Sequence, residues 1–294
     1  MKNIYTIPLL LLAFILGSCS EDKLSNVSVI VDPVEEPNEF DTWILGNYTN
    51  VYNIDVKYRI EDIEADMNYN LVPADLTKSV TITQLVKYLC LEAYDTVTGS
   101  PEFIKSYFPK ILSLIGSPAY KNNGSMVLGT AEGGQKITLY NVNLLNMKDV
   151  EQLNEWYFRT IHHEFAHILH QTIPYTSAFE EISGANYITD NWSGLSEEDA
   201  LQKGFITPYA SSAVSEDFVE LISVFATISP EQWEAKLALA EEEKSPGRKI
   251  IEAKFAIVKN YLSESWNIDL EALRSEIAQR IEKMDQYDFT ELQK

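Results

Sequence analysis

The segment that decides how this chain folds reads His162-His163-Glu164-Phe165-Ala166-His167-Ile168-Leu169-His170 and contains all four histidines of the sequence. It lies in Val150–Thr172, where apolar residues recur at helical spacing and predict one long helix. On a helix, His163 and His167 are one turn apart on the same face, so both imidazoles can reach one ion. Glu164 is about 100° round the helix from His163, near that ion but not bound to it. A carboxylate in this place can take a proton from a zinc-bound water, which makes Glu164 the candidate general base.

The other two histidines are poorer candidates for metal binding. His170 is seven residues from His163, a rise of about 10.5 Å, whereas the ligands of one zinc ion lie within about 4 Å of each other. We therefore expect His170 either to line the cleft or to be a surface or packing histidine. His162 is turned away from the pair, and we assign it no role. Because a catalytic zinc ion needs three protein ligands and an open position, the third ligand must come from elsewhere in the chain.

The third ligand should be a carboxylate on a later helix, because no glycine–histidine pattern follows His167. Six acidic residues between positions 180 and 220 are candidates: Glu180, Glu181, Asp190, Glu216, Asp217 and Glu220. The best pair is Glu216 and Glu220, which share one face of the predicted helix Glu216–Ile228, while its apolar residues form a separate stripe.

Two carboxylates one turn apart repel each other unless a cation lies between or beside them. A metal ion with its imidazoles would supply that positive charge. Glu216 would then be the third ligand, and Glu220 would accept a hydrogen bond from a ligand histidine. The alternative is a solvated acidic first turn, which the helix dipole favours.

The N-terminus carries a targeting segment. Lys2 precedes the apolar run Ile7–Leu16, and Leu16-Gly17-Ser18-Cys19 resembles a bacterial lipobox. We therefore expect residues 1–18 to be a lipoprotein signal peptide and Cys19 to carry lipid. Residues 19–39 are acidic and would tether the lipid to a domain of residues 40–294. The apolar run is too short to span a membrane, so the N-terminal lipid would be the only membrane attachment.

Ser20-Glu21-Asp22 resembles the acidic signal that directs Bacteroidetes-type lipoproteins to the outer face of the outer membrane. The net charge of −21 argues against a nucleic-acid partner, because phosphate binding needs clustered Lys and Arg. Solubility explains this charge, and a cationic substrate is the alternative. If Cys19 carries lipid, Cys90 has no disulfide partner, and its apolar neighbours predict a buried free thiol.

Strands and helices segregate along the chain, which favours an α+β fold over a doubly wound sheet. The predicted helices outside the histidine segment are Phe40–Tyr52, Thr81–Tyr94, Pro101–Leu114, Glu216–Ile228, Pro230–Glu243, Gly247–Ser263 and Asp269–Met284, and the predicted strands are Asn53–Ile60, Ser125–Gly129 and Lys136–Val142. We expect a small mixed sheet packed on the histidine helix and a helical C-terminal part. Lys136–Val142 is either an edge strand that receives a peptide substrate or a buried central strand.

The spacing of Tyr209, Glu216 and Glu220 resembles the ligand segment of the anthrax lethal factor protease domain, where a tyrosine, a ligand glutamate and a second glutamate have the same offsets. More closely, the lipobox, the HEFAH segment and these three residues are similar to zinc metallopeptidase lipoproteins of Bacteroidetes, described as substrate-import-associated zinc metallohydrolases. The similarity extends through most of the mature chain, although Val219 stands where alanine is usual.

The resemblance implies a zincin-like fold and a gluzincin-like site, with the Tyr209 hydroxyl on the oxyanion side. It also implies an import system of the outer membrane as partner, and it leaves the substrate open. We therefore expect a cell-surface metallopeptidase, in which zinc-bound water activated by Glu164 attacks a peptide carbonyl of a peptide or protein substrate. One alternative is a catalytically weak lipoprotein that captures peptide or glycan fragments for import. A purely structural zinc site is the other, and Glu164 argues against it because such a site needs no base.

Overall fold

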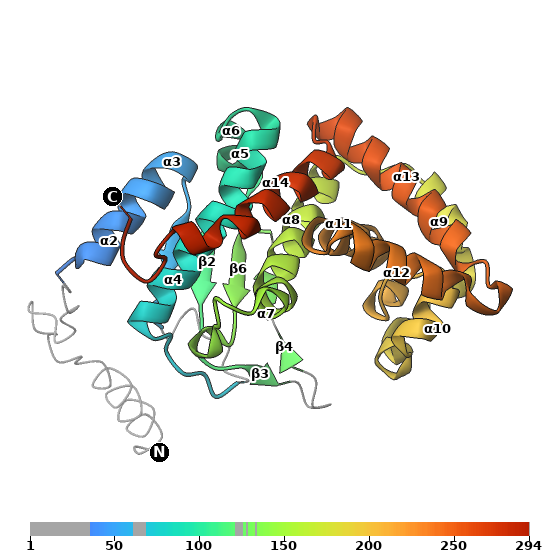
Figure 1. Cartoon of the computed structure of the whole chain (residues 1–294), viewed down its shortest axis with the longest axis horizontal. Helices are drawn as coiled ribbons and strands as arrows, with labels where there is room; N and C mark the ends of the chain where they lie inside the picture. Colours follow the sequence, from blue (N-terminus) through green and yellow to red (C-terminus); the bar gives the residue numbers. More distant parts are fainter. Residues whose placement is uncertain (1–35, 61–68, 121–125, 128, 133, 294) are drawn as a thin grey trace, which may run out of the picture. The chain divides into compact units, whose positions relative to one another are not determined.

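The computed structural model describes residues 36–60, 69–120, 126–127, 129–132 and 134–293 (Figure 1). The chain divides into two units, Met1–Pro37 and Asn38–Lys294, and every helix and strand given below belongs to the second. The predicted signal peptide, Cys19 and the tether up to residue 35 lie outside the described residues. Within the described ranges, no helix has both the length and the apolar character needed to cross a membrane.

The domain begins with a helical segment made of α2 (Glu39–Ile44), η1 (Leu45–Thr49) and α3 (Asn50–Tyr52), as the spacing of its apolar residues predicts. Asn38 and Asp41 form a capping box at its start. Strand β1 (Asp55–Lys57) follows. Ile54, Val56 and Tyr58 are buried, whereas Asp55 is exposed and Lys57 is partly exposed. This alternation agrees with the strand predicted over Asn53–Ile60, but only Asp55–Lys57 pairs with another strand.

The next helical segment comprises α4 (Leu76–Val86), η3 (Lys87–Leu91), α5 (Glu92–Thr98) and α6 (Glu102–Tyr107), and β2 (Ile111–Leu114) follows it. The prediction of one helix over Pro101–Leu114 was wrong in its second half. Phe108 is extended because it precedes Pro109, and the proline ring disfavours the helical conformation for the residue before it. The short apolar run after Pro109 then forms a buried strand.

The main sheet has the strand order β1-β2-β6-β5, in which β5 is Gly129–Glu132 and β6 is Lys136–Leu139. The β1–β2 and β2–β6 pairs are parallel, and β5 pairs antiparallel with β6, so the sheet is mixed. Strands β3 (Ala119–Tyr120) and β4 (Met126–Val127) form a separate antiparallel pair. Because β6 lies between β2 and β5 and all four of its residues are buried, the edge-strand interpretation of Lys136–Val142 was wrong.

The rest of the domain is helical, as expected, and the fold is α+β. The histidine segment lies in the run α7 (Val150–Leu153), η5 (Asn154–Phe158) and α8 (Arg159–Thr172). The later α-helices are α9 (Ala178–Ser183), α10 (Glu197–Gln202), α11 (Val214–Thr227), α12 (Pro230–Glu241), α13 (Gly247–Trp266) and α14 (Leu270–Glu282). Short helical turns are η4 (Val142–Leu144), η6 (Gly184–Asn186), η7 (Thr189–Gly194), η8 (Tyr209–Ser212), η9 (Glu242–Lys244) and η10 (Met284–Gln286).

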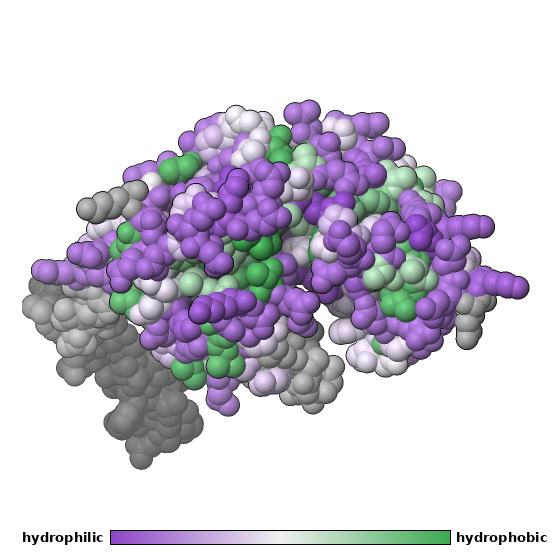
Figure 2. All heavy atoms as spheres, in the orientation of Figure 1, coloured by the Kyte–Doolittle hydropathy of each residue, from purple (hydrophilic) through white to green (hydrophobic). Residues whose placement is uncertain are grey.

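Helices α8 and α11 lie side by side, and their contact positions the histidines (Figure 1). On α8, Phe165 is fully buried and packs its ring against aromatic rings of α5, α6 and the residue after α6, namely Tyr94, Phe103 and Phe108. On α11, every residue from Asp217 to Thr227 is buried. Elsewhere, the face drawn in Figure 2 is mostly hydrophilic, in line with the charge of the chain.

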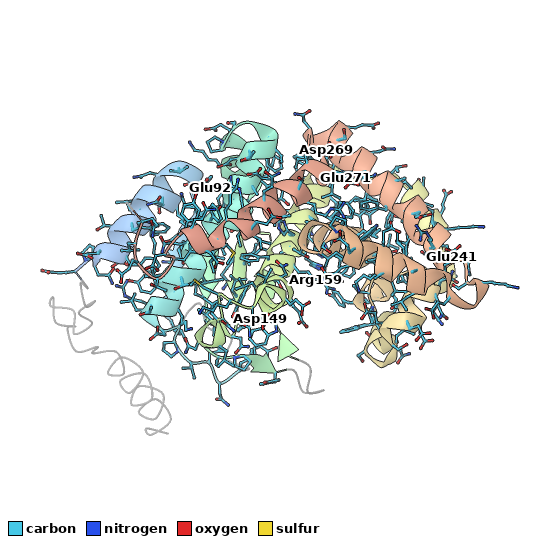
Figure 3. The ribbon with its side chains drawn as sticks, viewed as in Figure 1. Glu92, Asp149, Arg159, Glu241, Asp269 and Glu271 are labelled. Carbon is cyan, nitrogen blue, oxygen red and sulfur yellow. The ribbon has the colours of Figure 1, made fainter. Side chains whose placement is uncertain are left out.

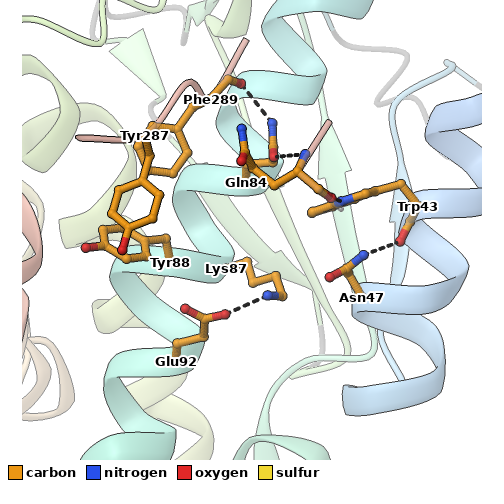
Figure 4. A pocket seen from close by; sticks show the side chains of 9 residues that line it. Trp43, Asn47, Gln84, Lys87, Tyr88, Glu92, Tyr287 and Phe289 are labelled. Carbon is orange, nitrogen blue, oxygen red and sulfur yellow. Dashed lines mark hydrogen bonds and ion pairs between the residues drawn. The ribbon is translucent and has the colours of Figure 1, made fainter. Parts of the chain in front are cut away.

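The C-terminal segment is fastened to α4 through the buried side chain of Gln84 (Figure 4). Its Nε2 donates to the carbonyl oxygens of Phe289 and Glu291 at 2.9 and 3.0 Å, and its Oε1 accepts from the backbone N–H of Gln293 at 3.1 Å. From α2, the Trp43 indole donates to the Gln293 carbonyl at 2.8 Å. The two ends of the domain are thus joined beside a cavity of about 330 Å³.

We expect Gln84→Ala to lower the free energy of unfolding by about 2–3 kcal/mol, because it removes three hydrogen bonds, of which the one to the Phe289 carbonyl is buried. Urea unfolding of the domain measures this loss. The matched control is Gln279→Ala on the exposed face of α14, which should change stability by less than about 0.5 kcal/mol. Equal effects of the two substitutions would show that Gln84 does not hold the C-terminal segment.

Candidate metal centre

Three donor atoms from two helices converge at the contact between α8 and α11. The Oε2 atom of Glu216 lies 3.1 Å from Nε2 of His163 and 3.2 Å from Nε2 of His167. The ligand atoms of these three residues all lie within 4.8 Å of one another, and among the described residues they form the one cluster with metal-ligand spacing. Two imidazoles and one carboxylate are a donor set that suits catalytic zinc. The other proposed third ligands, Glu180, Glu181 and Asp190, are not in this cluster.

The ionisable groups of this cluster shift the pKa values of His163 and Glu216 in opposite directions. Burial opposes protonation of His163, but its hydrogen bonds to Glu216 and Glu220 outweigh burial and raise its pKa to about 9. Burial likewise favours the neutral acid of Glu216, but hydrogen bonds to His163 and His167 lower its pKa to about 2. Protonated His163 and the carboxylates therefore compensate one another's charge, and a metal ion would replace the proton that His163 takes up.

Glu220 binds the far side of the His163 ring. Its Oε1 lies 2.8 Å from Nδ1 of His163, and its Oε2 accepts hydrogen bonds from Thr207, at 2.6 Å, and from Arg159. Burial raises the pKa of Glu220, but the charge of Arg159 and the bond to His163 outweigh it and hold the pKa well below the usual range. The carboxylate therefore fixes the proton of His163 on Nδ1, which leaves Nε2 to face Glu216.

Two partners of Glu220 were not identified from the sequence. Arg159 lies at the start of α8 (Figure 3), one turn before His163, and this spacing was its only signal. Thr207 lies thirteen residues before Glu220 in the chain, and no sequence pattern marks it.

Asp217, the residue after Glu216, anchors the first turn of α11. Asp217 is fully buried and accepts hydrogen bonds from Lys254 of α13 at 2.6 Å and from the Tyr187 hydroxyl at 2.9 Å. Asp217 was one of the candidates for third ligand, but its carboxylate pairs with Lys254 and is not among the clustered donors. This buried ion pair fixes the rotation of α11 and hence the direction of Glu216.

Glu164 and Tyr209 flank the donors. Glu164 is half-buried, and burial raises its pKa against the opposing effect of His163 and His167. The Tyr209 ring lies 5.8 Å from the His163 ring and 5.0 Å from the Trp192 ring, as measured between ring centroids. Burial raises the pKa of Tyr209, so its hydroxyl keeps its proton at neutral pH and can donate. The sequence did not single out Trp192.

The remaining histidines have different partners. The Nε2 atom of His170 lies 3.0 Å from Nδ1 of His167, and burial lowers the pKa of His170 to about 4. His162 is buried on the opposite side of α8 from the donors, with its Nδ1 3.0 Å from the Tyr94 hydroxyl and its Nε2 3.9 Å from Sγ of Cys90. Cys90 is free and buried, as predicted.

An α+β domain whose metal donors come from two packed helices, with an unbound glutamate beside them, defines the class of HExxH metalloproteins. Residues 33–271 match the family model described as "Putative zinc-binding metallo-peptidase", and the chain belongs to this family. It is also similar to a solved structure described as "a putative zinc-binding metallo-peptidase" from Bacteroides caccae. The two are 43% identical with a TM-score of 0.76, and the match covers 88% of this chain and 99% of the other. No curated protein matches the chain in sequence.

The donor set predicts one zinc ion per chain. His163→Ala and His167→Ala should each abolish zinc retention, because two donors do not hold the ion tightly. His170→Ala should still bind one zinc ion when the metal is in micromolar excess, because His170 is not among the clustered donors. Elemental analysis after equilibrium dialysis against micromolar zinc measures the content, and a His170→Ala protein that holds no zinc under these conditions would contradict this ligand assignment.

Proposed function

We propose that the chain is a zinc-dependent metallopeptidase with a gluzincin-like site and a zincin-like fold. The observation that carries the proposal is the convergence of His163, His167 and Glu216 beside a half-buried glutamate, Glu164, that is not one of the donors. Family membership supports a zinc-dependent hydrolase. A structural zinc site would need neither a neighbouring base nor an accessible tyrosine, whereas Tyr209 is 37% exposed.

Each residue around the donors has a task that suits peptide hydrolysis. Zinc bound by the three donors would supply a Lewis acid that polarises the carbonyl and makes water more acidic. Glu164 accepts the proton of the attacking water and then returns it to the leaving amine, a role that its raised pKa favours. Tyr209 donates a hydrogen bond to the oxyanion, because its hydroxyl stays protonated. Glu220 keeps the His163 ring oriented.

Four substitutions separate metal binding from turnover. Glu216→Ala should weaken zinc binding severely, and Glu220→Ala should weaken it by about 10–100-fold. Glu164→Gln should retain zinc and abolish turnover, because it removes only the proton acceptor. Tyr209→Phe should retain zinc and lower turnover by about 10²–10³-fold, the effect of one lost oxyanion donor. Zinc affinity and cleavage of a diverse peptide library by the metal-loaded protein measure both properties.

The control for these variants is Glu180→Gln, an exposed acidic residue on α9, which should change neither property. A binding lipoprotein that captures peptide or glycan fragments would show the two metal effects and cleave none of the library. Unchanged zinc affinity in Glu216→Ala would show that the third ligand is another carboxylate.

We also propose that the mature protein is anchored by lipid on Cys19 at the outer face of the outer membrane, next to an import system that takes up the products. The support is the lipobox Leu16-Gly17-Ser18-Cys19 and the acidic residues after it. Cys19→Ala should release the protein from the membrane fraction, as measured by cell fractionation. Membrane retention of this variant would contradict the anchor, and Cys90→Ala is the matched control.

A further inference from the structure

The two histidines of the metal cluster have different hydrogen-bond acceptors behind them. His163 has the carboxylate of Glu220, whereas Nδ1 of His167 lies 3.0 Å from Nε2 of His170, one turn further along α8. The Nε2 atom of His167 faces Glu216, so metal binding uses the lone pair of this nitrogen and places the ring proton on Nδ1. That proton points to Nε2 of His170, which can only accept it as a neutral imidazole.

The position of His170 is fixed by an aromatic cluster. Its ring packs on Tyr175, at a centroid distance of 5.4 Å, and on Phe218 of α11, at 6.2 Å. Tyr175 in turn stacks on Phe218 at 4.1 Å and contacts Phe179 of α9 at 5.5 Å. Two separate parts of the chain, the turn that carries Tyr175 and helix α11, therefore hold one imidazole at hydrogen-bond distance from a metal-cluster histidine.

We propose that His170 is a positioning residue that accepts the Nδ1 proton of His167 and orients its Nε2 toward the metal. The inference rests on the proposed function, because it assumes that the cluster binds zinc. It assigns a role to a histidine that lies outside the donor set. Acceptors behind ligand histidines set ring orientation and ligand basicity, and their loss costs about 10–100-fold in metal affinity.

Three substitutions at position 170 separate hydrogen bonding from packing. His170→Phe keeps an aromatic ring against Tyr175 and Phe218 but has no acceptor, His170→Ala removes both, and His170→Gln restores an acceptor oxygen. We expect zinc affinity to fall by about 10–100-fold in the Phe and Ala variants and to stay within about threefold of wild type in the Gln variant. Competition with a chromophoric chelator at pH 7.5 measures the affinity of the mature protein.

Two further measurements detect a purely structural effect of the substitution at position 170. The melting temperature of the metal-free His170→Phe protein should stay close to wild type, while the visible absorption of its Co²⁺ form should change because His167 is no longer oriented. Wild-type affinity and an unchanged Co²⁺ spectrum in His170→Phe would overturn the inference and leave a packing role only, and so would a His170→Gln variant as weak as His170→Ala. A wild-type protein that binds no zinc would instead overturn the proposed function itself.

Discussion

The contact between α8 and α11 concentrates negative charge, and the rest of the site follows from how that charge is balanced. Glu164, Glu216 and Glu220 are all at least half-buried beside His163 and His167. With both imidazoles neutral, three carboxylates and the single guanidinium of Arg159 leave a net charge of −2, which a divalent cation neutralises. Without such an ion His163 takes up a proton, as its pKa of about 9 indicates. Buried charges are tolerated only when they are paired, so the cluster favours cation binding.

A second buried charge pair sets the rotation of α11 and thereby the direction of the carboxylates in this cluster. Asp217 and Lys254 are both fully buried and bind each other between α11 and α13. Such a pair contributes little net stability, because the cost of removing two charges from water offsets their attraction. It does specify geometry, since a rotation of α11 would separate the two charges. Glu216 and Glu220 lie on either side of Asp217 along the helix, so the rotation that satisfies Lys254 also points them at α8.

The sequence predicts the parts of the site that depend on spacing within one helix. Histidines four residues apart on α8 lie on one face, and so do Glu216 and Glu220 on α11. The contact between these faces is tertiary, so six carboxylates remained candidates until Glu216 was seen between the two imidazoles. Thr207, Trp192 and the acceptor role of His170 depend wholly on tertiary packing and have no sequence signal. The errors in the fold were local: Pro109 ends the helix that was extended to Leu114, and β6 is central because β5 covers its other side.

The exposed fraction of the side chains around the cluster increases from Glu220 to Tyr209. This gradient bears on the choice between a structural and a reactive metal site. The side chain of Glu220 is 4% exposed, that of His163 9% and that of Glu216 18%, and the residue Tyr209 is 37% exposed. The donors therefore have the buried carboxylate of Glu220 behind them, and exposure increases toward Tyr209. A structural zinc site is closed by its ligands, whereas a catalytic one keeps a position open to water and substrate. Glu164 and Tyr209 both flank the donors, the placement that the proposed proton acceptor and the proposed hydrogen-bond donor to a reacting carbonyl require.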